Sequence, residues 1–91
     1  MAMTKTTTIV WGSEEEQYLD SLNAARKAKL TEMAADGKTD LAVETINPVT
    51  TKRFWRDIAA AEEFISFIME QAEIYQCTIV STLTEDYTAP V

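Results

Sequence analysis

The sequence predicts an α+β fold whose elements follow one another in the order β-α-β-β-α-β. β-branched and aromatic residues gather in short runs that are typical of strands. These runs are 4–11, 41–46, 49–56 and 77–84. Two longer stretches instead place their apolar residues at helical spacing. Since a chain of 91 residues builds one modest core, we expect a single domain over residues 1–91.

The first strand and the first helix adjoin each other. Residues 4–11 read TKTTTIVW, and this β-branched run ends at Gly12. Ser13 is followed three residues later by Glu16, which is the spacing of a capping box. A helix is therefore expected over about residues 14–35, with acids in its first half and bases later, an order that complements the helix dipole.

The apolar stripe of this first helix is weak. Asn23 and Arg26 interrupt its register, so we expect partial exposure or a break near the middle. Gly37 is the expected end of the helix, because glycine readily adopts the left-handed conformation that closes many helices.

A hairpin is expected next. Residues 41–46 (LAVETI) and 49–56 (VTTKRFWR) have strand composition. Asn47 and Pro48 between them suit a tight turn, with proline at its second position. The two strands are therefore expected to pair antiparallel.

The second helix is the most regular part of the chain. Asp57 is its expected N-cap. Apolar residues recur at steps of three and four, which places them on one face: Ile58, Ala61, Ile65, Ile68, Ala72 and Tyr75, widened by Phe64 and Met69. A strand from Cys77 to about Thr84 follows, and residues 85–91 are expected to form a loose tail.

This order of elements is that of the ferredoxin-like, split βαβ arrangement, an antiparallel sheet covered by two helices. An alternative is a shorter, helix-covered β meander that becomes stable only as a dimer.

The net charge of −7 is unevenly distributed. Residues 1–56 contain eight acids and eight bases, whereas the remainder contains seven acids and no Lys or Arg. Such segregation favours a basic partner and disfavours nucleic acid. The candidate partner-binding face consists of Glu62, Glu63, Glu70 and Glu73. The alternative interpretation is an acidic helix face that is only solvated.

Several kinds of chemistry lack their residues. The chain has no His and one cysteine, Cys77, so a zinc cluster or an imidazole-activated nucleophile is excluded. Two glycines cannot form a phosphate-binding glycine motif. We therefore expect no enzyme activity, no cofactor and no metal site. No apolar run reaches membrane-spanning length and no leader precedes the first strand, which favours a cytoplasmic location.

A second candidate binding site mixes bases with aromatic residues on the expected third strand. It consists of Lys52, Arg53, Phe54 and Trp55. This placement is similar to that of the base-stacking aromatics in RRM proteins, which would imply RNA binding. The glycines of the RRM motif are absent, and the following helix is acidic.

Eight aromatic rings are many for so small a core. We expect some of them to be exposed and to promote self-association, most simply as a homodimer. Size, acidity and the lack of catalytic residues resemble small phage-encoded accessory proteins. The leading hypothesis is a non-enzymatic interaction protein that binds a protein partner. The acidic helix would mimic nucleic acid, or the aromatic surface would build an assembly. The other hypotheses are an RNA-binding module and a binder of small ligands between subunits.

Overall fold

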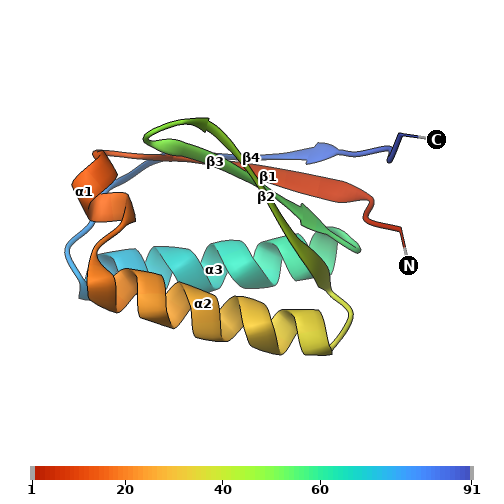
Figure 1. Cartoon of the computed structure of the whole chain (residues 1–91), viewed down its shortest axis with the longest axis horizontal. Helices are drawn as coiled ribbons and strands as arrows, with labels where there is room; N and C mark the ends of the chain where they lie inside the picture. The colour runs from red at the N-terminus through yellow and green to blue at the C-terminus, as the bar shows by residue number, and fades with distance from the viewer. Residues whose placement is uncertain (1, 91) are drawn as a thin grey trace.

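A computed structural model describes residues 2–90; Met1 and Val91 lie outside the described residues. Two layers are visible in Figure 1, a four-stranded sheet and two long helices on one of its faces. The elements are β1 (Lys5–Trp11), α1 (Glu14–Gln17), α2 (Asp20–Ala35), β2 (Thr39–Asn47), β3 (Thr50–Trp55), α3 (Ile58–Ile74) and β4 (Ile79–Asp86). All strand pairs are antiparallel, in the order β2-β3-β1-β4. The predicted ferredoxin-like fold is confirmed.

The core lies between the sheet and the helices. Trp55 of β3 is fully buried and its ring packs 4.8 Å from that of Phe64 on α3. Trp55 Nε1 also donates to Thr7 Oγ1 on β1 at 3.0 Å, so the buried indole keeps a hydrogen-bond partner. Ile9 and Trp11 continue the same face of β1. The two central strands thus carry the core, and β2 and β4 form the edges.

The first helix is broken earlier than expected. Residues 14–17 form α1, and α2 begins at Asp20, so the break lies at Tyr18 and Leu19 rather than near Asn23. The cause is tertiary: Gln17 is buried, and its side-chain amide donates to Pro48 O in the β2–β3 turn at 2.6 Å. The Gln17 carbonyl accepts instead from Arg26 at 3.1 Å.

The expected helix ends are confirmed. The Glu16 amide donates to Ser13 Oγ at 3.2 Å, and the Ala60 amide donates to Asp57 Oδ1 at 2.9 Å. At the end of α2, Gly37 adopts a φ of 74°. The Lys38 amide reaches back to the carbonyl of Met33, which is the Schellman closure.

The expected loose tail begins inside the sheet. Glu85 and Asp86 belong to β4, opposite Thr6 and Lys5 of β1. The amide of Tyr87 donates to Thr4 O at 2.9 Å, which extends this pairing. The prediction that residues 85–91 are loose is therefore wrong for 85–87, because residues 4–6 at the start of the first strand extend far enough to pair with them.

The edge strand β2 is irregular. Its register on β3 shifts between Thr39 and Val43, because β2 contains two more residues than β3 over this stretch. Leu41 lies within this bulge at a φ of 65°, a conformation that bulky residues rarely adopt. The bulge carries Leu41 toward α2, where it forms part of a pocket described below.

Candidate functional site

The acidic face predicted on α3 is divided by the structure. Glu62, Glu70 and Glu73 are exposed, and we call them the acidic row. Glu63 instead accepts from Lys38 at 2.9 Å and from Lys29 at 3.0 Å. The hydrogen bond from Lys38, followed by that from Lys29, lowers the pKa of the Glu63 carboxyl below its ordinary value. Its charge is thus used to join α3 to α2.

An uncovered apolar surface lies beside the acidic row. Ile58, Ile65 and Met69 are separated by seven and four residues and so share one side of α3. We call these residues the α3 strip. Ile58 is 45% exposed and Met69 is 53% exposed, while Ile65 is half-buried. The predicted apolar stripe is therefore wider than the part of α3 that the sheet covers.

The α3 strip faces away from α2. Lys29 of α2 reaches Glu63 and also lies 5.5 Å from the centre of the Phe67 ring, which identifies the side of α3 that meets α2. The strip lies roughly 160° around the helix axis from these two residues. Because α2 packs on β2 whereas α3 packs on β1, β3 and β4, the strip lies toward the β4 edge.

The aromatic surface predicted from the sequence is small. Trp11, Trp55 and Phe64 are fully buried. Among the other rings, Tyr18 is exposed, at 45%. The apolar side chains at the surface are mainly aliphatic. Tertiary packing explains the difference, since the sheet and α3 together accommodate both indoles in one layer.

The basic-aromatic strand does not form one surface. Arg53 and Trp55 lie opposite Thr7 and Lys5 of β1 and face the helices, whereas Lys52 and Phe54 face the open side of the sheet. Phe54 packs edge-on against Tyr87, with ring centres 4.9 Å apart.

Acids also flank the residues of this strand that face the open side of the sheet. Glu44 of β2 lies directly opposite Lys52. On the other side, Thr6 of β1 pairs with Phe54, and Glu85 of β4 pairs in turn with Thr6. This arrangement is unlike a basic platform for stacking bases.

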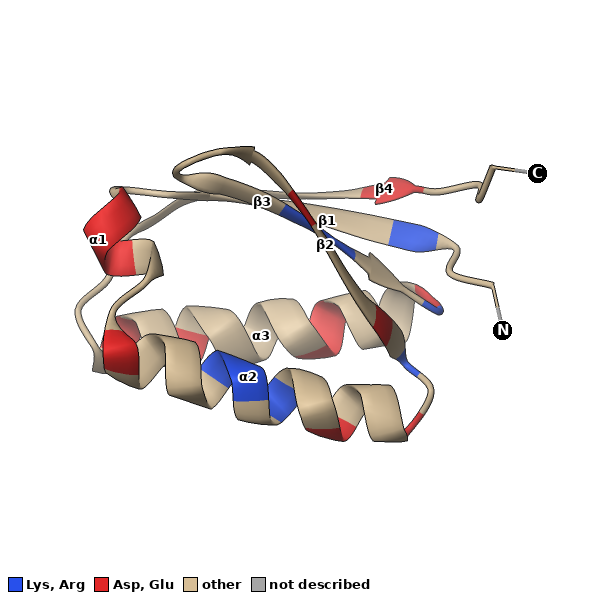
Figure 2. Cartoon of the chain, in the orientation of Figure 1, with Lys and Arg blue, Asp and Glu red and all other residues tan. Residues whose placement is uncertain are grey.

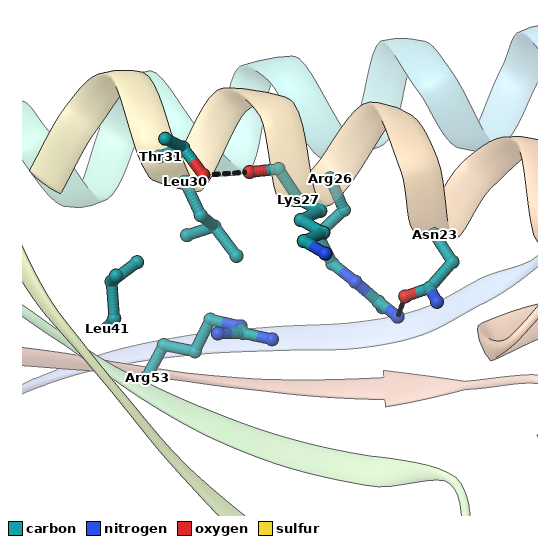
Figure 3. A pocket seen from close by; sticks show the side chains of 7 residues that line it. All are labelled: Asn23, Arg26, Lys27, Leu30, Thr31, Leu41 and Arg53. Atoms are coloured by element: carbon teal, nitrogen blue, oxygen red, sulfur yellow. Dashed lines mark hydrogen bonds between the residues drawn. The ribbon is translucent and has the colours of Figure 1, made fainter.

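A pocket of about 290 Å³ between α2 and the β2–β3 edge was not predicted from the sequence. Figure 3 shows its side chains, Asn23, Arg26, Lys27, Leu30 and Thr31 from α2, Leu41 from β2 and Arg53 from β3. We call it the arginine pocket. One signal was available: Arg26 interrupts the apolar stripe of its helix, as a buried cation would. That Arg26 lies near Arg53 depends on the fold, and no local sequence pattern predicts it.

Other reactive groups are few. Burial, followed by the charge of Glu16, raises the pKa of the Cys77 thiol, which makes it a poor nucleophile. Within residues 2–90, acidic and cysteine side chains do not cluster in a way that could hold a metal ion. The described helices include none with the length and apolar composition needed to span a bilayer.

Comparison with known proteins adds no family to this description: no family model, curated protein or solved structure matches the chain.

Proposed function

We propose that this protein is a non-enzymatic interaction protein whose α3 helix binds a basic segment of another protein. The observation that carries the proposal is the α3 strip with the acidic row beside it. Glu62 and Glu73 stand seven and four residues from Met69, so both acids border the strip. Glu70 lies further round toward solvent. A partner would bury the strip and place its cations against the row.

Charge favours a basic protein over a second copy of this chain. A second copy that docked α3 against α3 would bring two acidic rows together, and like charges at an interface are unfavourable. Duplex nucleic acid is disfavoured for the same reason. A partner that alternates apolar and basic residues satisfies both parts of the surface. This is the form of recognition that the nucleic-acid-mimic hypothesis requires.

The strip supplies the contact energy and the row supplies orientation. Apolar surface removed from water contributes about 25 cal/mol per Å². Exposed carboxylates add less to affinity than to the rate and selectivity of association, and their effect weakens with salt. A role as a phage-type accessory protein, suggested by size and acidity, stays a broader prediction.

The experiment compares partner capture by the parent with capture by two charge-reversal variants. One variant changes Glu62, Glu70 and Glu73 to Lys. The matched control changes three exposed acids on other elements to Lys, namely Glu15, Glu44 and Glu85. Both variants carry the same net charge, so a nonspecific charge effect acts on them equally. Captured proteins are identified by mass spectrometry, and cross-links to α3 are mapped.

We expect a basic partner that the parent and the control variant retain and the α3 variant loses. Met69→Asp, which leaves the acidic row intact, should also lose it. Equal capture by both triple variants, or capture that does not weaken with salt, would contradict the proposal. Cross-links between two copies of the chain through α3 would identify the occupant as a second copy instead.

A further inference from the structure

The arginine pocket gathers positive charge in a molecule whose net charge is −7. Its seven lining residues include Arg26, Lys27 and Arg53, and none of the seven is acidic. In Figure 3 the side chains of Arg26 and Arg53 extend into the space between α2 and the sheet, from opposite sides. Figure 2 shows the bases of α2 as a band in the middle of that helix. The pocket is therefore positively charged, although the protein as a whole is negative.

Both guanidinium groups lack a carboxylate partner. The ion pairs among residues 2–90 include neither Arg26 nor Arg53, although Lys5, Lys29, Lys38 and Arg56 are paired. Arg26 is only 6% exposed, and its Nη2 donates to the neutral oxygens of Gln17 and Asn23, at 3.1 Å and 2.8 Å. Arg53 makes no side-chain hydrogen bond within the described residues.

Burial makes this arrangement unfavourable for the protein alone. Burial, followed by the neighbouring Arg26, lowers the pKa of Arg53 to about 10. Burial also lowers the pKa of Arg26, and the nearby Tyr18 partly opposes that effect. Arg26 is buried and Arg53 is half-buried, and like charges removed from water without a counter-ion are costly unless a further group compensates them. An anion from solution is the group that would do so.

We propose that the arginine pocket binds a small organic anion, with a phosphate or carboxylate group held between Arg26 and Arg53. Guanidinium groups match such oxyanions because their planar N–H pairs donate two parallel hydrogen bonds. Lys27 adds a third cation at the rim. The site is independent of the α3 strip, because it is lined by α2, β2 and β3.

The apolar lining indicates that the ligand is more than a bare ion. Leu30 of α2 and Leu41 of β2 line the pocket beside the two arginines, and a volume of about 290 Å³ exceeds what a single oxyanion fills. Leu41 stands in the β2 bulge at a positive φ, a conformation that leucine disfavours. A ligand with a ring or short chain attached to its anionic group fits both the arginines and the apolar part of the lining.

The experiment titrates the intact protein with inorganic phosphate, phenyl phosphate and benzoate. Chemical shifts of the arginine Nε–Hε groups report binding at the site, and thermal denaturation reports stabilisation. The test variant is Arg53→Met. Its control is Lys52→Met, which removes the same charge from the adjacent residue on the opposite face of β3. Arg53→Lys keeps the charge and removes the guanidinium geometry.

We expect phenyl phosphate or benzoate to bind more tightly than inorganic phosphate, and whichever aryl anion binds better identifies the head group. Arg53→Met should weaken binding about tenfold or more, the factor that corresponds to one charge-assisted hydrogen bond. Lys52→Met should change the affinity less than about twofold, because Lys52 lies on the opposite face of β3 from the pocket. The affinity of Arg53→Lys for the anion should lie between those of the two methionine variants.

Two results would overturn the proposal. One is the absence of arginine shifts with any of the three anions at tens of millimolar. The other is equal weakening by Arg53→Met and Lys52→Met, which would reduce binding to a general charge effect. If Arg53→Met does not fold, Lys27→Met carries the test, since Lys27 is exposed at the rim and its loss should weaken binding several-fold.

Discussion

At the scale of single residues, the end of α3 is closed by a residue that does not suit its conformation. Gln76 has a φ of 57°, and the amide of Cys77 donates to Ala72 O at 2.7 Å. This is the closure that Gly37 makes at the end of α2. A residue with a Cβ pays about 1–2 kcal/mol in the left-handed region.

Gln76→Gly should therefore stabilise the protein by about 0.5–1 kcal/mol, after the larger backbone entropy of glycine in the unfolded chain is subtracted. Gln76 is exposed, so little packing is lost. Gln71→Gly, inside α3, is the control and should destabilise by about 1 kcal/mol. Urea denaturation measures both. A loss of stability in Gln76→Gly would contradict the assigned role of this position.

The lysine contacts of Glu63 predict a dependence of stability on pH. Because its pKa is lower in the folded state than its ordinary 4.5, ionised Glu63 stabilises the fold above that pH. This contribution is lost as the pH falls through the folded-state pKa. The group is partly exposed, so we expect only about 0.5–1 kcal/mol.

Denaturation from pH 6 to pH 3 tests this dependence. Glu63→Gln should be less stable than the parent at pH 6 and should approach it at pH 3. Glu62→Gln, at the exposed neighbouring position, should follow the parent throughout. A difference between parent and Glu63→Gln that does not shrink with acid would exclude an ionic origin.

At the scale of elements, α3 has a covered face and an uncovered one. The sheet buries Ala61, Phe64, Ile68 and Ala72, whereas Ile58 and Met69 remain exposed. The helical spacing found in the sequence is thus correct, but the centre of the buried face is rotated toward Phe64. Spacing alone gives the apolar side of a helix and not how much of it a sheet will cover.

Ile68→Asp should unfold the protein, because Ile68 is fully buried and an unpaired carboxylate there costs several kcal/mol. Glu70→Lys should change stability by about 0.5 kcal/mol or less, since Glu70 is exposed. Thermal melts distinguish the two variants. An Ile68→Asp protein that melts like the parent would mean that the assigned face of α3 is wrong.

At the scale of the whole molecule, the sheet is open at both edges. Eight of the nine residues of β2 are exposed, including Leu41, Val43 and Ile46. Long apolar edge strands tend to pair with other chains. The prediction of self-association therefore rests on this aliphatic edge rather than on the aromatic residues that suggested it in the sequence.

We expect two copies to associate weakly through β2, and to do so more strongly as salt screens a net charge of −7 on each. This salt dependence is opposite to the one expected for a basic partner of α3, whose binding should weaken with salt. Sedimentation across micromolar concentrations measures it. Ile46→Lys should weaken association, and Val80→Lys on the other edge should not. A single 10.2 kDa species at all concentrations and salt levels would contradict the prediction.

The sequence by itself determined the fold class, the order of the strands and long helices, and three helix ends. These depend on local chemistry: β-branched runs, the caps Ser13 and Asp57, and the glycine at position 37. Each signal lies within about one turn of helix or a few residues of strand, so it can be recognised without knowing which distant residues pack against it.

Only the tertiary structure decided where the charges act. Glu63 looked like the other acids of α3 until the packing of α2 placed Lys29 and Lys38 against it. Arg53 and Arg26 are 27 positions apart in the sequence and line one pocket only because α2 packs over the β2–β3 edge of the sheet. Burial and pairing of a charge depend on neighbours that the chain brings together from a distance, and no local pattern records them.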